Sequence, residues 1–167
     1  MVALDKNGTP LRPALMWMDV RADKEAEAVL ETGDQRLILN GNGQGPVSAE
    51  WMIPKALWLK RNEPKIFDEA VTICEYQDYL TMRLTGERCA SLNNIGLRWH
   101  YANRDGGWAS GIVEKLGMPD LLEKWPSRVV APGEVVGNLS AAAAAELGLS
   151  TRTKLVQGGA DALIGMI

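Results

Sequence analysis

The sequence predicts an α/β domain with a largely parallel sheet, on two observations. Short apolar runs that favour strands alternate along the chain with segments rich in helix-forming residues, and this alternation is typical of β-α-β units. The chain has 167 residues, of which 46% are hydrophobic and 23% are charged. This length and composition suit about one globular domain and exclude wholesale disorder.

Charge and composition exclude several classes of function. The formal net charge is −3, whereas a general nucleic-acid or anionic-membrane binder is normally basic. No apolar run approaches the roughly 18 residues of a membrane span, and the start of the chain has no signal-peptide pattern. There is one histidine, and Cys74 and Cys89 do not form a Cys-x-x-Cys motif, so we expect no metal site. We expect a protein of the reducing cytoplasm.

The first elements are expected in the following order. The residues from Val2 onward resemble the end of a strand, and Asp5, Asn7 and Gly8 predict a turn after it. Residues 14–18 are continuously apolar, which predicts a strand that is buried on both faces. The next elements are helices over 22–30 and 54–62, a short helix from Pro64, a strand over 71–74 and a helix over 76–84.

The second half predicts a helix over 108–116, a short strand at 135–136, a helix that Ser140 caps, a strand over 154–157 and a helix over 162–167. Glycines at 33, 86, 117 and 148 are the expected helix ends. The last helix has only about two turns, and nothing precedes the first strand. Both ends therefore look cut, and we expect a fragment of a larger protein.

A glycine-rich stretch at Gly41–Gly45 suggests two alternatives. Backbone N–H groups in such loops can cradle a phosphate, but this stretch lacks the Gly-Lys-Ser/Thr ending of a P-loop and no clear strand leads into it. A flexible surface loop is the favoured interpretation.

Asp161 is the first candidate for chemistry. It follows a strand and the two glycines Gly158 and Gly159, and it precedes a helix. Glycines at such a turn allow positive φ and let a ligand approach the backbone closely. In α/β sheets, ligands bind at the carboxyl ends of the strands. A plain N-capping aspartate, without any ligand, is the competing interpretation and is favoured on the physics alone.

Two further stretches are candidates for a binding site. Asp19 and Arg21 directly follow the expected strand over 14–18, although a helix cap and a solvated arginine are the favoured explanation on the physics alone. Residues 93–101 combine amides, Arg98 and three rings, a mixture that sugar sites use, and Trp51 is a weaker version of the same pattern. The single histidine, His100, could shuttle protons, but a structural role is favoured.

Several motifs, taken together, resemble the FGGY-type carbohydrate kinases. The stretch Pro13–Ala22 is similar to the family's Pro-x-x-x-Trp-x-Asp-x-Arg-Ala segment, and Lys55–Lys60 to its Lys-x-Leu-Trp-Leu helix. Asp78–Glu87 resembles the Asp-Tyr-Leu-x-x-x-Leu-Thr-Gly signature, which is quite specific. The order is completed by Val136–Ser140, the alanine-rich helix and Gly158–Ala162. Arg98–Tyr101 looks closest to the pentulose branch of the family.

The resemblance implies part of an actin-like, ribonuclease-H-fold domain of a two-domain sugar kinase. A pentulose-like sugar would bind in the first domain, and ATP with Mg²⁺ would bind between the domains. Asp161 would be the catalytic base on the sugar hydroxyl. Arg98 and Trp51 would line the sugar pocket, which Asp19 and Arg21 would support. Gly158 and Gly159 would contact the nucleotide.

The chain also departs from the family pattern. The family's N-terminal Asp-x-Gly-Thr turn, which handles phosphate and Mg²⁺, has no counterpart here, and neither does the ATP-binding second domain. We therefore expect residues 1–167 to form part of the sugar-binding N-terminal domain and to be inactive alone. A non-catalytic sugar-binding or assembly module, including a homodimer, stays open as the alternative. A dinucleotide enzyme is disfavoured because no Gly-x-Gly-x-x-Gly follows a strand.

Overall fold

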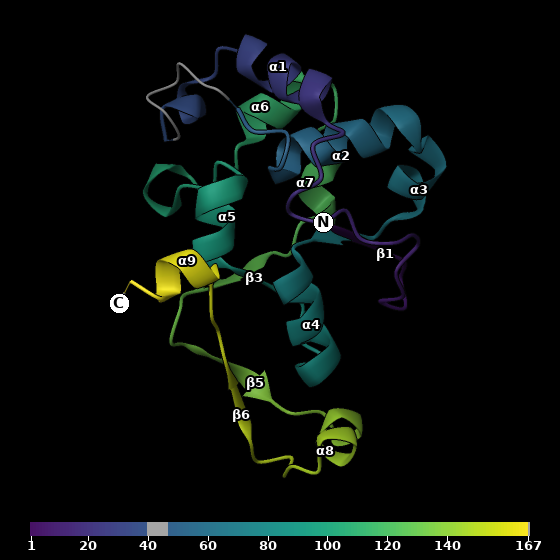
Figure 1. Cartoon of the computed structure of the whole chain (residues 1–167), viewed down its shortest axis with the longest axis vertical. Coiled ribbons are helices and arrows are strands. Elements are labelled where there is room, and N and C mark those ends of the chain that lie inside the picture. Colours follow the sequence, from purple (N-terminus) through teal and green to yellow (C-terminus); the bar gives the residue numbers. More distant parts are fainter. Residues whose placement is uncertain (40–46, 167) are drawn as a thin grey trace. The chain divides into compact units, whose positions relative to one another are not determined.

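The computed structural model describes residues 1–39 and 47–166, in two compact units (Figure 1). Unit 1 comprises Met1–Ile73 and Gly96–Trp125, and unit 2 comprises Cys74–Ile95 and Pro126–Ile167. The glycine-rich stretch Gly41–Gly45 lies outside the described residues. In the part of the chain that is described, no helix has the length and apolar character that a membrane crossing requires.

The N-terminal strand and its turn agree with the prediction. β1 (Val2–Leu4) is buried along its whole length and pairs with β2 (Thr72–Cys74). Asp5 then forms the turn, because its Oδ1 accepts the backbone N–H groups of Asn7 and Thr9, both at 2.8 Å. Short polar side chains that bond to the following backbone are a common cause of such turns.

The strand predicted over 14–18 is wrong. Only Leu15 is buried there, and its N–H and carbonyl bond to the carbonyl and amino group of Met1. Met16, Trp17 and Met18 form an exposed turn, in which Trp17 is 58% exposed. Lys55 supports this turn, because its Nζ donates to the carbonyl oxygens of Met16 at 2.6 Å and Trp17 at 3.3 Å. The continuous apolar run predicted a buried strand, but the side chains of Met16, Trp17 and Met18 face solvent.

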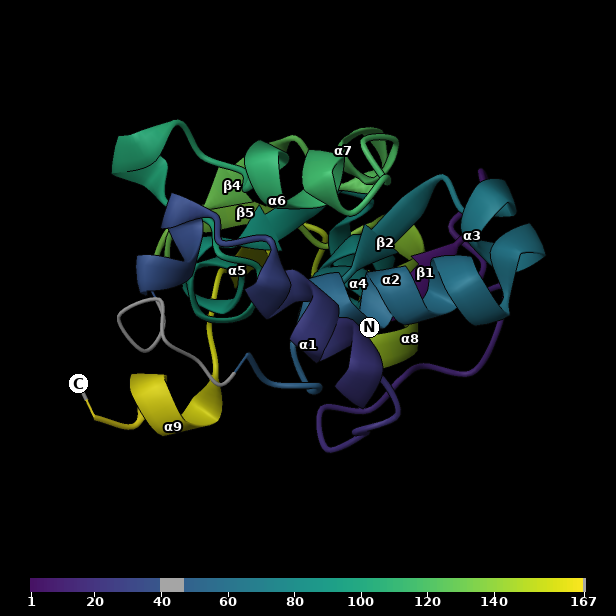
Figure 2. The same cartoon turned by 90° about the horizontal axis from the view of Figure 1, so that it is seen from above.

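Helices make up most of unit 1. α1 packs on α2, and α2 packs on α3, as Figures 1 and 2 both show. Seven side chains of α2 are buried, which explains its length, and the helix starts two residues before the predicted Pro54. The helices of unit 1 are α1 (Asp23–Glu31), α2 (Met52–Asn62), α3 (Pro64–Glu69), α6 (Ser110–Lys115) and α7 (Leu121–Lys124), with 3-10 turns at Gln35–Leu39 and Asn103–Asp105.

An aromatic cluster lies in the core of unit 1. Trp99, which is 1% exposed, contacts Trp125 and Trp108 at ring-centroid distances of 4.9 and 5.9 Å. Tyr101 packs edge-on against Trp108 at 5.0 Å. Aromatic pairs at such distances stabilise a core beyond the area they bury. Trp99 and Trp125, which are 1% and 2% exposed, are therefore core residues of unit 1.

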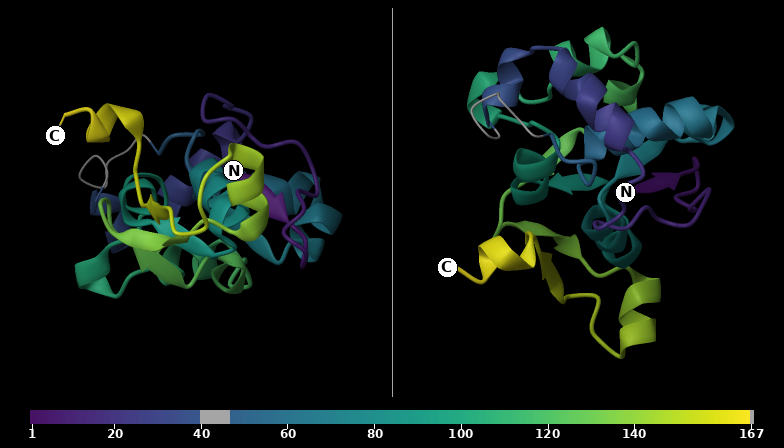
Figure 3. Two further views of the ribbon diagram at one scale, coloured as in Figure 1. Left: turned by 90° about the horizontal axis from the view of Figure 1, so that it is seen from below. Right: turned by 45° about the horizontal axis from the view of Figure 1, so that its top comes forward.

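Unit 2 contains short strands and helices (Figure 3). β3 (Cys89–Ser91) runs parallel to β4 (Arg128–Val130), and β5 (Val135–Asn138) runs antiparallel to β6 (Lys154–Val156). A small core of Cys89, Val130, Val136 and Leu155 joins the two pairs. The helices are α4 (Tyr76–Thr85), α8 (Ala141–Leu147) and α9 (Asp161–Ile164). α5 (Leu92–Arg98) begins in unit 2 and ends in unit 1.

The helix ends in unit 2 confirm the sequence signals. Ser140 caps α8 by accepting the N–H of Ala143, and Gly86 and Gly148 end α4 and α8 in the left-handed conformation. The expectation of a largely parallel sheet is not met. The described strands form three separate two-stranded sheets, and β5 and β6 run antiparallel. β3, β4 and α5 were not predicted. Strands of three residues are too short to show an alternating pattern.

Candidate functional site

Asp161 lies in unit 2, after the carboxyl end of β6 and at the start of α9, in the order of strand, turn and helix that the sequence predicts. It is exposed and is the first residue of α9, while Ala160 is the N-cap residue. Its Oδ1 accepts the N–H of Ala162 at 2.8 Å. The interpretation as an N-cap is therefore wrong. Among the ion pairs of the described part of unit 2, such as that of Arg128 with Glu87, none includes Asp161.

The two glycines before Asp161 differ from the expectation. Neither Gly158 nor Gly159 has a positive φ. The carbonyl of Gly158 accepts the Oγ–H of Ser91 at 2.9 Å. A Cβ on Gly159 would lie 2.5 Å from Oδ1 of Asn93, which is closer than real atoms approach. Glycine is therefore required at 159 by the closeness of Asn93, and not by an unusual backbone conformation.

Asp19 and Arg21 form a close ion pair in unit 1. Arg21 Nε lies 2.9 and 3.0 Å from the two carboxylate oxygens of Asp19, and its guanidinium carbon lies 4.8 Å from the ring centroid of Trp58. The hydrogen bond from Arg21 lowers the pKa of Asp19. Asp19 does not cap α1, whose N-cap residue is Ala22. The pair orders an exposed segment, and the Asp19 carboxylate is neutralised by its neighbour.

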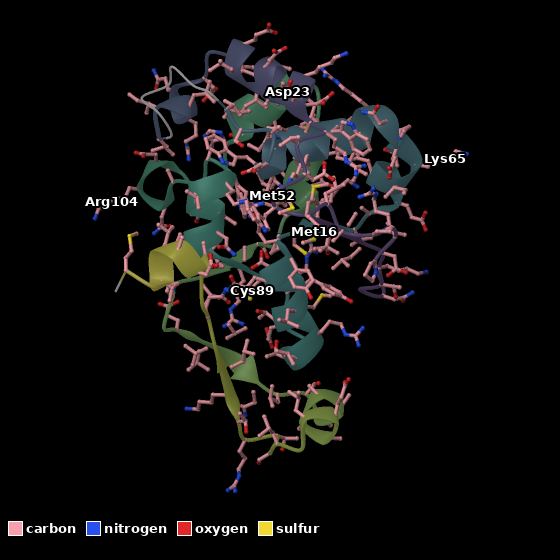
Figure 4. The ribbon with its side chains drawn as sticks, viewed as in Figure 1. Met16, Asp23, Met52, Lys65, Cys89 and Arg104 are labelled. Carbon is pink, nitrogen blue, oxygen red and sulfur yellow. The ribbon has the colours of Figure 1, made fainter. Side chains whose placement is uncertain are left out.

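Arg98 and Trp51, the residues expected to line the sugar pocket, are brought close to the same stretch of unit 1. Arg98 donates from Nη2 to the carbonyl of Glu50 at 3.2 Å and lies 3.8 Å from the sulfur of Met52. Both side chains are partly buried. Met52 is labelled in Figure 4 at the start of α2. The guanidinium of Arg98 thus contacts the two residues on either side of Trp51 in the sequence.

His100 packs beside Trp51. The two rings meet edge to face, with centroids 5.3 Å apart. His100 is 1% exposed, its φ is +52°, and its ring nitrogens have no hydrogen-bond partner in the described part of the chain. Burial lowers its pKa to about 4, so the ring is neutral near pH 7. A proton shuttle must reach solvent or substrate, so this burial supports the structural interpretation.

The stretch over 93–101 does not act as one site. Asn93 and Asn94 belong to unit 2, where Asn93 bonds to Ala160 and Asn94 donates to Gln77 at 2.8 Å. Trp99 belongs to the aromatic core of unit 1. Arg98 also bonds within the protein, so its role as a candidate sugar contact depends on the family resemblance.

Three residues support the turn before Asp161, a role that the sequence did not predict for any of them. Ser91 and Asn93 bond to the turn before Asp161, and Asp78 accepts the N–H of Ser91 at 2.9 Å. Asp78 is 3% exposed, and burial raises its pKa to about 7. Asp78 belongs to the Asp-Tyr-Leu signature and lies three residues after the N-cap of α4, where an acidic residue is a recognisable signal. Asn93 belongs to the candidate stretch over 93–101, but nothing in the sequence links it to Asp161, and Ser91 carries no signal.

The described residues do not supply a metal site. Within residues 1–39 and 47–166, no three histidine, cysteine or carboxylate side chains are grouped so that they could hold one metal ion. Asp161 alone offers a single carboxylate at the turn. The side of Gly159 that faces Asn93 is filled by that side chain. Packing therefore explains this glycine without a nucleotide, and we derive no step through Mg²⁺.

Comparison with known proteins identifies the chain's relatives. The model of the FGGY family of carbohydrate kinases, N-terminal domain, matches residues 1–167. An FGGY carbohydrate kinase domain-containing protein of Danio rerio is 34% identical over 182 aligned positions, which cover 100% of this chain and 33% of that protein. A xylulose kinase of Streptomyces coelicolor is 35% identical and covers 83% of this chain and 28% of that protein.

A solved structure agrees with these relatives. The xylulose kinase of Rhodospirillum rubrum superposes with a TM-score of 0.80 at 30% identity, over 97% of this chain and 33% of that protein. The present fold is therefore that of the N-terminal third of these kinases, which is an actin-like fold. The chain spans about a third of the length of the relatives it matches.

Proposed function

The chain belongs to the FGGY family of carbohydrate kinases, and from that premise we propose that it forms the sugar-binding part of an enzyme that phosphorylates a pentulose with ATP. Kinases of this family are ATP-dependent phosphotransferases. The observation that supports the proposal most is the exposed carboxylate of Asp161. It follows β6 and a turn that hydrogen bonds from Ser91 and Asn93 hold in place. The pentulose rests on the xylulose kinases among the similar proteins.

In this proposal Asp161 is the general base. The sugar hydroxyl gives its proton to the Asp161 carboxylate while its oxygen forms a bond to the γ-phosphorus of ATP. The bond between that phosphorus and the β–γ bridging oxygen breaks, and ADP leaves. A positioned base of this kind is worth about 10²- to 10⁴-fold in rate. Phosphoryl transfer depends otherwise on positioning and on charge stabilisation.

The sugar contacts are proposed in unit 1. The Arg98 guanidinium can donate to sugar hydroxyls, and the indole face of Trp51 suits the C–H face of a sugar. The Asp19–Arg21 pair would support the pocket indirectly, since its charges are satisfied by each other. We expect Arg98→Met and Trp51→Ala to raise KM for the sugar by about tenfold, because each removes one contact of about 1.4 kcal/mol.

ATP is the second substrate in this proposal, and Gly158 and Gly159 are its proposed contacts in this chain. This assignment depends on the family resemblance alone. Mg²⁺ would accompany ATP and supply charge neutralisation. We also propose that residues 1–167 alone are inactive, as part of the N-terminal domain of an enzyme whose relatives are about three times longer than this chain. Both cysteines are free thiols, which suits the proposed cytoplasmic location.

The test is sugar-dependent ADP formation by the complete enzyme encoded by the reading frame that contains this chain. The panel holds xylulose, ribulose, glycerol and gluconate, and Asp161→Asn is the blank. We expect kcat/KM for one pentulose to exceed that for glycerol and gluconate at least tenfold. Phosphorylation of none of the sugars, or a preference for glycerol or gluconate, would contradict the proposal.

The isolated chain separates the alternative from the main proposal. Calorimetry of residues 1–167 against the same sugars, together with light scattering, tests for a sugar-binding or assembly module. Sugar binding without ATP binding, or a defined homodimer, would favour the module. Turnover by the isolated chain above its Asp161→Asn variant would refute the expectation that it is inactive.

A further inference from the structure

The turn between β6 and Asp161 is held by two side chains of a neighbouring segment of unit 2. Ser91, the last residue of β3, donates its Oγ–H to the carbonyl of Gly158 at 2.9 Å. Asn93, on the first turn of α5, accepts the N–H of Ala160 through Oδ1 at 2.9 Å. These two bonds hold the peptide groups on both sides of Gly159.

We call the side chains of Ser91 and Asn93, with these two hydrogen bonds, the brace. It packs closely against Gly159. Oδ1, Cγ and Cβ of Asn93 lie 2.5, 2.7 and 2.9 Å from the place where Gly159 would carry a Cβ. Such an approach leaves the turn almost no freedom to shift toward α5. Asn93 therefore acts both as a hydrogen-bond acceptor and as a wall for the backbone.

The brace is anchored in the interior of unit 2. Ser91 is fully buried, and its N–H donates to Oδ1 of Asp78 at 2.9 Å. Asp78 is 3% exposed and lies on the first turn of α4. Cys89, at the other end of β3, packs in the small core of the unit and is labelled in Figure 4. A rigid element thus fixes the backbone up to Ala160.

Asp161 itself is exposed, so packing does not set the direction of its carboxylate. Its Oδ1 accepts the N–H of Ala162 at 2.8 Å, and the held peptide groups immediately before Asp161 fix where this residue lies. A misplacement of about 1 Å at a reacting group can cost about a hundredfold in rate. Resting on the proposed function, we propose that Asn93, together with Ser91, is a positioning residue that places the Asp161 carboxylate for proton abstraction from the sugar.

The kinetic test compares matched variants of the complete enzyme. Asn93→Ala removes the acceptor of the Ala160 N–H, whereas Asn93→Asp keeps an acceptor oxygen at the same place. Ser140→Ala is the control, because it removes a side-chain bond to backbone in unit 2, at the N-cap of α8, away from the turn. We expect Asn93→Ala to lower kcat about 10- to 100-fold, with KM for sugar and ATP changed by less than about threefold.

We expect Asn93→Asp to recover kcat to within about threefold of the unsubstituted enzyme, and Ser140→Ala to leave it unchanged. Ser91→Ala should lower kcat as Asn93→Ala does, and it replaces that variant if the latter does not fold. An equal loss of kcat in Ser140→Ala and Asn93→Ala would show a general structural effect and overturn the inference. So would a rise in KM with kcat unchanged.

Hydrogen exchange of the Ala160 amide gives a readout that does not depend on activity. In the complete enzyme, this amide should exchange at least about tenfold faster in Asn93→Ala, and at the original rate in Asn93→Asp. If the unsubstituted enzyme phosphorylates sugar but the Ala160 amide exchanges at an unchanged rate in Asn93→Ala, the inference about Asn93 is overturned and the proposed function is not. Absence of sugar-dependent ADP from the unsubstituted enzyme overturns the proposed function, and the inference with it.

Discussion

All six tryptophans of the chain lie in unit 1 and none lies in unit 2. In unit 1 the candidate sugar contacts Trp51 and Arg98 lie next to aromatic packing. The ring of Trp51 lies against His100, and Trp99, the residue after Arg98 in the sequence, is buried in the core. Unit 2 has strands of three or four residues and holds the turn before Asp161 by hydrogen bonds from Ser91 and Asn93.

The two arrangements differ in how they respond to single changes. Packing distributes the stabilisation over many contacts, whereas a hydrogen-bonded turn depends on a few atoms with defined geometry. We therefore expect single substitutions near Asp161 to disturb its position strongly. Single substitutions around Arg98 should mainly weaken binding.

The units also bury ionisable groups of opposite kind. In unit 2, burial raises the pKa of Asp78 to about 7, and in unit 1, burial lowers the pKa of His100 to about 4. Both side chains are therefore neutral at a pH between these two values, about 5.5. Their contributions to stability consequently change with pH in opposite directions, which gives each unit its own signature.

The largest expected effect is that of Asp78. Between pH 4 and pH 7 folded Asp78 keeps a proton that an unfolded aspartate, with a pKa of 3.8, has lost. Its stabilisation is therefore full below about pH 4 and is lost as pH rises through 7. The pKa difference of about three corresponds to about 4 kcal/mol. Relative to the unsubstituted chain, Asp78→Asn should gain about this free energy of unfolding between pH 4 and pH 8.

Urea unfolding followed by far-UV circular dichroism measures this difference. Asp68→Asn, which changes an exposed carboxylate in α3, is the control for the loss of one negative charge. A pH-independent difference between Asp78→Asn and the unsubstituted chain would show that Asp78 does not titrate in this range.

His100 should produce the opposite trend in unit 1. Its stabilisation is full above the ordinary histidine pKa of 6.5 and is lost as pH falls through 4. The difference corresponds to about 3 kcal/mol. His100→Asn removes the titration and suits the φ of +52°, since asparagine tolerates the left-handed conformation.

Tryptophan fluorescence during urea unfolding reports on this change, because every tryptophan is in unit 1. The variant should lose stability at pH 7 through lost packing on Trp51, and this loss should shrink by about 3 kcal/mol as pH falls to 4. A constant loss across this range would contradict the account of His100.

Gly159→Ala should have the next largest effect. The new methyl group would overlap Asn93, and overpacking of this kind costs about 1–3 kcal/mol. We also expect at least a tenfold loss of turnover, since the turn must move. Gly158→Ala is the matched control, because its Cβ would meet only Nε2 of Gln77 at 3.5 Å. Equal melting temperatures for the two variants would contradict the close fit.

The smallest expected effect is that of Asp19→Asn. The Asp19–Arg21 pair is partly exposed, with the Arg21 side chain 41% accessible, and such pairs contribute less than about 1 kcal/mol. The pair lowers the pKa of Asp19, so its contribution is present above the usual carboxyl pKa and is lost as pH falls through the lowered value. Urea denaturation should show a small difference in the free energy of unfolding between Asp19→Asn and the unsubstituted chain at low salt, and this difference should shrink at high salt. A loss of several kcal/mol would contradict this assignment.

The sequence predicts helices better than strands in this chain, and the reason is local chemistry. Ser140, Gly86 and Gly148 mark helix ends by bonds that form within a few residues, so they are visible in the sequence. The run over 14–18 was misassigned because the burial of an apolar residue depends on distant segments. The three-residue β3 and β4 are formed by pairing across the chain and carry no local signal.

The candidate site was predictable to a similar extent. The position of Asp161 after a strand and two glycines was visible, because strand, turn and helix succeed one another in the sequence. The bonds from Ser91 and Asn93 were not visible, since they join segments about 67 residues apart. The reason for glycine at 159 depends on that same contact, and this explains why a positive φ was expected there instead.

The most direct test of the central claim is single-turnover phosphoryl transfer by the complete enzyme at saturating pentulose and ATP. Asp161→Asn should slow the chemical step by about 10²- to 10⁴-fold, while the affinity for the sugar stays within about threefold. Asp19→Asn should slow it by less than about tenfold, because Arg21 already neutralises that carboxylate. A chemical step at the unsubstituted rate in Asp161→Asn would contradict the assignment of Asp161 as the base.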